Sequence, residues 1–216
     1  AFDEAPYGRN ERTGEIESAS RSVGLGIDVD LLSIIQLREK SLNSVPANPH
    51  LHDLLENLLG KDFYLDRAVV RRARGKCGRF YFHKDQHGDI GLTVLLNDLG
   101  ENEGATTALP GKHLGVPPSL YTIRNVNPEH PDEVRMTGKA GDAYLFYRDI
   151  DHSRAPNLAD KANTQLFLAF INKNTFPAAH SRQGINLEDL EGVEPSLKHM
   201  LRPYDGEPLD GRKGFI

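Results

Sequence analysis

The sequence has a single cysteine, Cys77, among its 216 residues, so no disulfide can form within the chain. A fold stapled by disulfides, as in small secreted proteins, is therefore excluded, and a reducing compartment is favoured. The sequence also lacks an apolar run long enough to cross a bilayer, and its first residues lack the basic and then apolar pattern of a signal peptide. We expect a soluble, cytoplasmic protein, although the sequence begins at Ala1 rather than at a methionine.

An excess of positive charge is missing as well. The chain has 26 Lys and Arg against 31 Asp and Glu, which gives a net charge of −5. Proteins that bind nucleic acid usually carry a basic patch that contacts the phosphates. We therefore expect neither a nucleic-acid partner nor a membrane partner. The composition does not indicate an oligomeric state.

The front of the chain has the patterns of an arm followed by helices. Residues 1–27 are polar with several glycines and predict an arm or a lid. From Asp28, apolar spacing as far as Leu37 predicts a helix that Asp28 or Asp30 could cap. A second helix is predicted over residues 50–59, ending at Gly60. Its apolar stripe is expected in the core and consists of Leu51, Leu54, Leu55, Leu58 and Leu59.

After residue 60 the periodicity changes from that of helices to that of strands. Short β-type runs separated by Gly, Asp and Asn predict an antiparallel sandwich or a small barrel, so the fold class is α+β. The length suits a single domain over 1–216, with helices and β core over 28–171 and a C-terminal extension over 172–216 that includes a helical segment, 186–200. The predicted strands are 63–65, 68–72, 80–82, 92–96, 121–124, 133–136, 141–147 and 165–171.

The run from Arg79 to Asp85 predicts an aromatic-rich strand that ends in His-x-Asp. Side chains two residues apart on a strand leave the same face, so His83 and Asp85 can point into one cavity while Lys84 points away. One imidazole and one carboxylate are two-thirds of the facial triad of non-haem iron(II) oxygenases. The competing His87-Gly88-Asp89 is a second His-x-Asp, but its composition favours a turn.

The third ligand of such a triad is predicted to be His152. It follows a strand-like run, 141–147, that is rich in aromatics, and it precedes a Pro-Asn break at 156–157. A strand end can present a metal ligand at the mouth of a barrel. The alternative is a histidine in a surface loop among the charges Arg148, Asp149 and Asp151. A further histidine, His113, is left outside the metal set.

With these motifs in order, the sequence resembles the phytanoyl-CoA dioxygenase-like family of iron(II)/2-oxoglutarate oxygenases over roughly residues 50–171. The resemblance implies a double-stranded β-helix with N-terminal helices packed on one sheet. It also implies iron(II) held by His83, Asp85 and His152, with O2 as oxidant and 2-oxoglutarate as co-substrate, which is decarboxylated to succinate. The motifs that carry it are 58–60, 82–85, 92–98, 101–104, 109–113, 141–142 and 152–157.

The sequence departs from the family at the co-substrate. The family has an arginine about eleven residues after the distal histidine, which binds the far carboxylate of 2-oxoglutarate, whereas this chain has Asn163 there. An amide cannot replace the charge of a guanidinium fork. Arg154, two residues after His152, and Arg72, on an early strand, are the candidate replacements. Gln165, Asn163 and Thr93 are weaker candidates.

These observations predict a dioxygenase that hydroxylates or otherwise oxidises a small organic molecule. The carboxylate of Asp85, where a halogenase of this fold has a small residue, favours hydroxylation over halogenation; desaturation, epoxidation and ring closure stay open. One alternative is a prolyl-hydroxylase-like enzyme acting on a peptide or protein, suggested by the Leu-Leu-Asn-Asp run at 95–98. Another is a module that kept the fold but lost turnover, suggested by Asn163.

Overall fold

The computed structural model describes residues 27–30, 43–73, 75–80, 82–85, 89–111, 130–172 and 191–201. The chain divides into two compact units. One comprises 1–29, 69–87 and 91–167, and the other comprises 30–68, 88–90 and 168–216. Within the described ranges, no helix is both long and apolar enough to cross a membrane. The predicted arm, the predicted strand at 121–124 and the predicted helix beyond residue 30 lie outside the described residues.

Helix α3, Pro49–Leu59, confirms the helix predicted over residues 50–59. The side chain of Asn48 caps its start by accepting hydrogen bonds from the amides of His50 and Leu51. Pro49 fits the first helical position because its missing N–H has no intrahelical partner there. Gly60 ends the helix with φ of +82°, a conformation that glycine adopts without strain.

The leucine stripe of α3 is only partly in the core, which corrects the prediction. Leu55 and Leu59 are buried, whereas Leu54 and Leu58 are 46% and 38% exposed. Residues four apart lie on one helical face, so Leu55 and Leu59 share the covered side, and Leu54 and Leu58 lie on the face beside it. A later helix, α4 (Pro195–Leu201), lies at the end of the segment predicted to be helical and buries three apolar side chains, Leu197, Met200 and Leu201.

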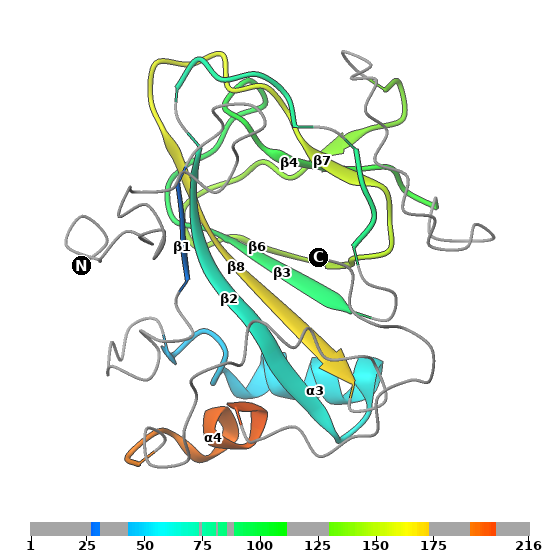
Figure 1. Cartoon of the computed structure of the whole chain (residues 1–216), viewed down its shortest axis with the longest axis vertical. Coiled ribbons are helices and arrows are strands. Elements are labelled where there is room, and N and C mark those ends of the chain that lie inside the picture. The colour runs from blue at the N-terminus through cyan, green and yellow to red at the C-terminus, as the bar shows by residue number, and fades with distance from the viewer. Residues whose placement is uncertain are drawn as a thin grey trace, which may run out of the picture. The chain divides into compact units, whose positions relative to one another are not determined.

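Eight strands form two sheets among the described residues (Figure 1). The first has the order β1-β2-β8-β3-β6, with bounds Ile27–Asp30, Phe63–Ala73, Asn163–Asn172, Ile90–Leu95 and Ala143–Tyr147. The second has the order β5-β4-β7, with bounds Val134–Arg135, Thr106–Ala108 and His152–Arg154, and β4 is antiparallel to both neighbours. These sheets agree with the predicted antiparallel β-sandwich.

The helix predicted from Asp28 is wrong over its first residues, because 27–30 form strand β1 beside β2. The β-branched Ile27 and Val29 alternate with Asp28 and Asp30, which is the period of a strand. A strand at the edge of a sheet gains backbone hydrogen bonds from its neighbour, and this tertiary pairing outweighs the local helical spacing.

The strand predicted from Arg79 to Asp85 is not a continuous ladder. Single antiparallel bridges join Cys77 to Asn157 and His83 to His152. From one bridge to the other, the first segment advances six residues, from 77 to 83, whereas the second advances five, from 152 to 157. The first segment therefore contains one extra residue, as in a β-bulge. A bulge bends a strand and redirects its side chains, and here the extra residue lies between Cys77 and the His-x-Asp motif.

A buried ion pair joins this segment to the residue directly before β5. Arg79 donates from Nη2 to Glu133 Oε1 at 2.9 Å, and the two side chains are 4% and 6% exposed. Arg135 donates from Nε to the same oxygen at 3.1 Å. Burial would raise the pKa of Glu133, but its hydrogen bonds from the two arginines outweigh burial and hold that pKa below its usual value. Glu133 is therefore ionised at neutral pH.

We expect Glu133→Gln to lower the free energy of unfolding by about 2 kcal/mol at pH 7, because Arg79 then loses its buried counter-charge. A carboxylate with a lowered folded-state pKa stabilises above its unfolded pKa, about 4.3, and this contribution is lost as the pH falls through the folded value. The difference between the variant and the wild type should therefore shrink below about pH 4, as measured by urea unfolding.

Asp132→Asn is the matched control, because the Asp132 side chain is 75% exposed. Its effect should stay within about 0.5 kcal/mol at every pH. A Glu133→Gln difference that is unchanged between neutral and acidic pH would show that the ionised carboxylate is not what stabilises this region.

Candidate metal centre

The two histidines of the predicted triad are joined through their backbones. The amide of His83 donates to the carbonyl of His152, and the amide of His152 donates to the carbonyl of His83, both at 2.9 Å. The two imidazole rings lie 4.3 Å apart between centroids. Residues far apart in the sequence are thus fixed side by side by a pair of reciprocal hydrogen bonds.

The ring of His152 is oriented by a hydrogen bond on the side away from the cluster. Its Nδ1 lies 2.9 Å from the carbonyl oxygen of Ile150. A carbonyl only accepts, so Nδ1 carries the proton and Nε2 keeps its lone pair for a metal. His152 begins β7 and pairs directly with Ala108 of β4. The second sheet therefore fixes the position of this ligand, and the carbonyl of Ile150 fixes its tautomer.

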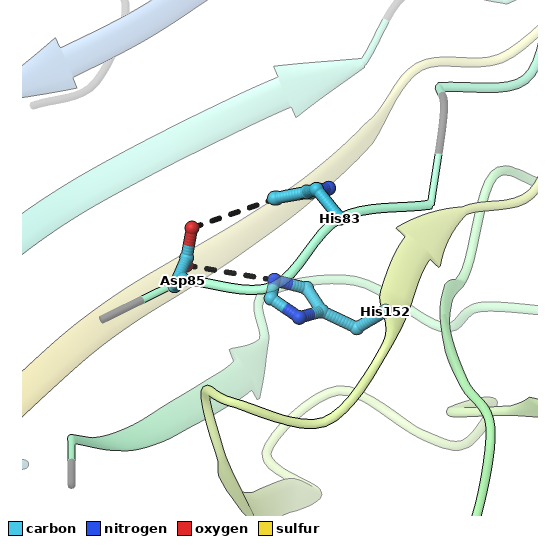
Figure 2. Close-up of side chains that lie close together, drawn as sticks. All are labelled: His83, Asp85 and His152. Atoms are coloured by element: carbon cyan, nitrogen blue, oxygen red, sulfur yellow. Dashed lines mark ion pairs between the residues drawn. The ribbon is translucent and has the colours of Figure 1, made fainter. Parts of the chain in front are cut away.

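The carboxylate of Asp85 faces both imidazoles, as Figure 2 shows. His83 Nε2 is 3.7 Å from Asp85 Oδ1, and His152 Nε2 is 3.5 Å from Asp85 Oδ2. One ligand atom from each residue lies within 4.8 Å of the other two. Two imidazoles and one carboxylate at this spacing fit a divalent transition metal bound on one face, with its other positions open to ligands.

The carboxylate of Asp85 is also held by an arginine. Arg148 donates to Asp85 Oδ2 from Nη2 at 2.6 Å and from Nε at 2.9 Å. Burial would raise the pKa of Asp85, but the charge of Arg148 outweighs it, and the pKa lies well below its usual value. A metal would therefore find this ligand already ionised.

Aromatic rings flank the histidines. The ring of Phe80 contacts that of His83 edge to face at 5.2 Å, and the ring of Phe146 lies 5.4 Å from that of His152. Lys84, between the first two ligands, lies 3.8 Å from Asp151 instead. This agrees with the prediction that Lys84 points away from the cluster.

The competing assignments receive no support from the described residues. Among them, His83, Asp85 and His152 form the group close enough to hold a metal, and Asp89 of the second His-x-Asp is not part of it. His87 and His113 lie outside the described residues. Cys77 is a free, buried thiol.

Arg154, a predicted co-substrate ligand, shares a face of the second sheet with His152. It lies two residues along β7 and pairs directly with Thr106 of β4. Partners directly opposite each other in a ladder project to the same face. One N–H of Arg154 donates to the carbonyl of Gly78 at 2.9 Å, which orients the guanidinium.

The predicted weaker contributors form a polar chain with protein partners. Asn163 donates to the carbonyls of Glu103 and Gly104 at 2.9 and 2.7 Å, and it accepts from Gln165 at 2.9 Å. Gln165 in turn accepts from the hydroxyl of Thr106 at 3.1 Å. Asn163 thus closes the start of β8 onto the turn before β4, and the chain of bonds leads to the residue opposite Arg154.

Arg72 and Thr93 lie on strands of the first sheet. Thr93 is buried in β3. Arg71, the neighbour of Arg72 on β2, has its guanidinium carbon 4.9 Å from the centre of the Phe167 ring. The guanidinium carbon of Arg148 lies 5.5 Å from the centre of the same ring. Successive side chains of a strand leave opposite faces. Arg71 therefore shares the face of Phe167 and Arg148, and Arg72 leaves the other.

The sequence interpretation missed Arg148, which it named only among the charges of the alternative in which His152 lies in a surface loop. In the structure it is 7% exposed and is bound to Asp85. A linear motif could not have identified this pair, because the two residues are far apart in the sequence. The available signal was only its place directly after the aromatic run of β6.

No protein-family model matches the chain, and no curated protein sequence matches it. Several solved structures resemble it in fold. SnoN, a non-haem α-ketoglutarate-dependent epimerase of nogalamycin biosynthesis, is 18% identical with a TM-score of 0.60, over 87% of this chain and 76% of SnoN. HygX from Streptomyces hygroscopicus, solved with nickel, 2-oxoglutarate and hygromycin B, is 11% identical with a TM-score of 0.59, over 72% of this chain and 73% of HygX.

EctD from S. alaskensis, solved with bound Fe, is 20% identical with a TM-score of 0.56, over 79% of this chain and 62% of EctD. The chain spans less than two-thirds of several of these proteins, for example 35% of EvdMO1 and 56% of the monooxygenase ThoJ. At these identities the likeness establishes the fold alone, which is of the jelly-roll type.

We expect the purified protein to bind one divalent transition metal per chain, and His83→Ala, Asp85→Ala or His152→Ala to remove most of the affinity. Loss of one of the three ligands should weaken metal binding by about a hundredfold or more, since even replacing a residue that only hydrogen-bonds to a ligand weakens it by roughly tenfold to a hundredfold. Metal content after dialysis, measured by elemental analysis, tests this. His87→Ala is the control, and loss of metal in that variant would mean that the second His-x-Asp supplies the ligands.

Proposed function

We propose that the chain is a non-haem iron(II)- and 2-oxoglutarate-dependent dioxygenase of the phytanoyl-CoA dioxygenase-like kind, and that it oxidises a small organic molecule. The cluster of His83, Asp85 and His152 is the observation that carries the proposal. It lies in a fold shared with HygX and EctD, whose structures hold nickel with 2-oxoglutarate and Fe, respectively. His83, Asp85 and His152 would hold the iron, which supplies the activation of oxygen when bound.

The protein's own contribution is to arrange the ligands before the metal arrives. The hydrogen bond to Ile150 keeps His152 Nε2 directed at the cluster, and the reciprocal backbone bonds hold His83 beside it. Because these contacts lock the ligands, little ordering is needed when the metal binds. Asp85 occupies the carboxylate position of the triad, which favours hydroxylation or a related oxidation over halogenation.

Arg154 is the proposed partner of the far carboxylate of 2-oxoglutarate. It shares a face with His152, and its guanidinium is oriented by Gly78. A carboxylate taken from water into a closed pocket needs a cation, because leaving it unpaired costs several kcal/mol. Arg72 is disfavoured because its neighbour on β2, Arg71, lies over the Phe167 ring. Successive side chains of a strand leave opposite faces, so Arg72 points away from that face.

The proposal is tested by incubating iron-loaded protein with 2-oxoglutarate and a panel of small molecules and measuring succinate. We expect slow succinate release with 2-oxoglutarate alone and faster release with a substrate, because bound substrate couples decarboxylation to its own oxidation. His152→Ala should release none. Succinate that appears only with a peptide would favour the prolyl-hydroxylase-like alternative. Its complete absence in a metal-loaded protein would favour a module without turnover.

We expect Arg154→Ala to raise the dissociation constant of 2-oxoglutarate by roughly tenfold to several hundredfold, as a few kcal/mol of charged hydrogen bonding is lost. Metal content should stay at the wild-type level, because Arg154 is not a ligand. Calorimetric titration of 2-oxoglutarate into the iron-loaded variants, under exclusion of oxygen, measures the dissociation constant. Elemental analysis measures the metal content.

Arg72→Ala is the matched control and should leave the affinity unchanged. If Arg72→Ala weakens binding and Arg154→Ala does not, the anchor lies on β2. If neither variant changes the affinity, another cation holds the carboxylate.

A further inference from the structure

Beyond the three ligands, Asp85 makes a contact that limits how it can bind a metal. The Nε and Nη2 groups of Arg148 both donate to Asp85 Oδ2, at 2.9 and 2.6 Å. The amide of Asp85 donates in turn to the carbonyl of Arg148 at 2.8 Å, so the backbone and the side chains join the same two residues. Oδ2 already accepts two charged hydrogen bonds, which leaves Oδ1 as the more available oxygen.

We propose that Arg148 is a positioning residue that restricts Asp85 to one metal-binding oxygen and keeps the metal centre positive enough to bind a dianion. This inference rests on the proposed function. A carboxylate that binds through both oxygens uses two of the six positions of an octahedral ion, whereas one bound through a single oxygen uses one. With His83 and His152, the second arrangement leaves three positions open, enough for a chelating co-substrate and oxygen.

The charges lead to the same conclusion. Two neutral imidazoles and one carboxylate around a divalent ion give a net charge of about +1, since only the carboxylate offsets the ion. The guanidinium of Arg148 cancels the charge of Asp85 and restores the net charge to about +2. The Arg148 side chain is 9% exposed, so solvent screens this effect only in part. A dianion such as 2-oxoglutarate is the ligand whose binding depends most on this difference.

Three residues lie around the Arg148 side chain: Gly91, Phe146 and Phe167. A Cβ on Gly91 would come within 3.1 Å of Arg148 Cγ and 3.1 Å of Phe146 Cζ, closer than most real contacts allow. The guanidinium lies over the ring of Phe167, with its carbon 5.5 Å from the ring centre. A glycine at 91 therefore gives the arginine its room, and the aromatic face favours its charge.

Substitutions at Gly91 and at Arg148 itself disturb this arginine without replacing a metal ligand. In Gly91→Ala the new methyl group pushes on Arg148 Cγ and on the ring of Phe146, whereas His83, Asp85 and His152 keep their side chains. Arg148→Met removes the charge and the donors but keeps an unbranched side chain. Arg71→Met is the matched control, because Arg71 also carries its charge over Phe167, at 4.9 Å.

The experiment uses cobalt(II)-loaded protein and compares two metal ligands, 2-oxoglutarate and neutral imidazole, by visible absorption. In Arg148→Met we expect the dissociation constant of 2-oxoglutarate to rise about tenfold or more, and that of imidazole to change by less than about threefold. Gly91→Ala should shift the 2-oxoglutarate constant in the same direction by a smaller factor. Arg71→Met should match the wild type for both ligands, and metal content should stay at one per chain in all of them.

Chemical rescue separates this role from a merely structural one. In Arg148→Ala, added guanidinium chloride at millimolar concentration should restore part of the affinity for 2-oxoglutarate, and sodium chloride should not. Equal weakening of both ligands, an unchanged constant in Arg148→Met, or the same loss in Arg71→Met would each overturn the inference. A wild-type protein that binds metal but not 2-oxoglutarate would instead overturn the proposed function, and the inference with it.

Discussion

The reciprocal backbone hydrogen bonds between His83 and His152 are the interaction on which the site depends. They join the segment before β3 to the start of β7, so two histidines that are distant in the sequence become neighbours. The bulge that precedes His83 adjusts the register so that this bridge can form alongside the one from Cys77 to Asn157. Without that register, the spacing of His-x-Asp alone could not assemble a triad.

The charges of the site follow from this arrangement. Asp85 is brought close to two imidazoles and a buried guanidinium, and its oxygens are shared unequally among them. In the same unit, Glu133 is held between Arg79 and Arg135, so the partly buried carboxylate of Asp85 and the buried carboxylate of Glu133 are each stabilised by arginine. Burying a carboxylate is costly unless such partners are present. The polar groups near the site are therefore fixed in position, as a metal centre requires.

The sequence predicted the parts of the protein that local pattern controls. Helix α3, strands β3, β6 and β8, and the triad followed from periodicity, capping residues and motif order. The predicted helix at Asp28 failed because sheet pairing decides the conformation of an edge segment. The burial of Leu54 was wrong because periodicity shows which residues share a face but not how far that face is covered. The Asp85–Arg148 contact depends on tertiary structure, which linear spacing does not encode.

We propose that the triad binds a metal, which in turn binds 2-oxoglutarate. The most direct test is a calorimetric titration of 2-oxoglutarate, without oxygen, into iron(II)-loaded protein and into the same protein stripped of metal. We expect one molecule bound per chain in the loaded protein and no measurable binding in the stripped one. Equal binding in both, or none in the loaded protein, would contradict it.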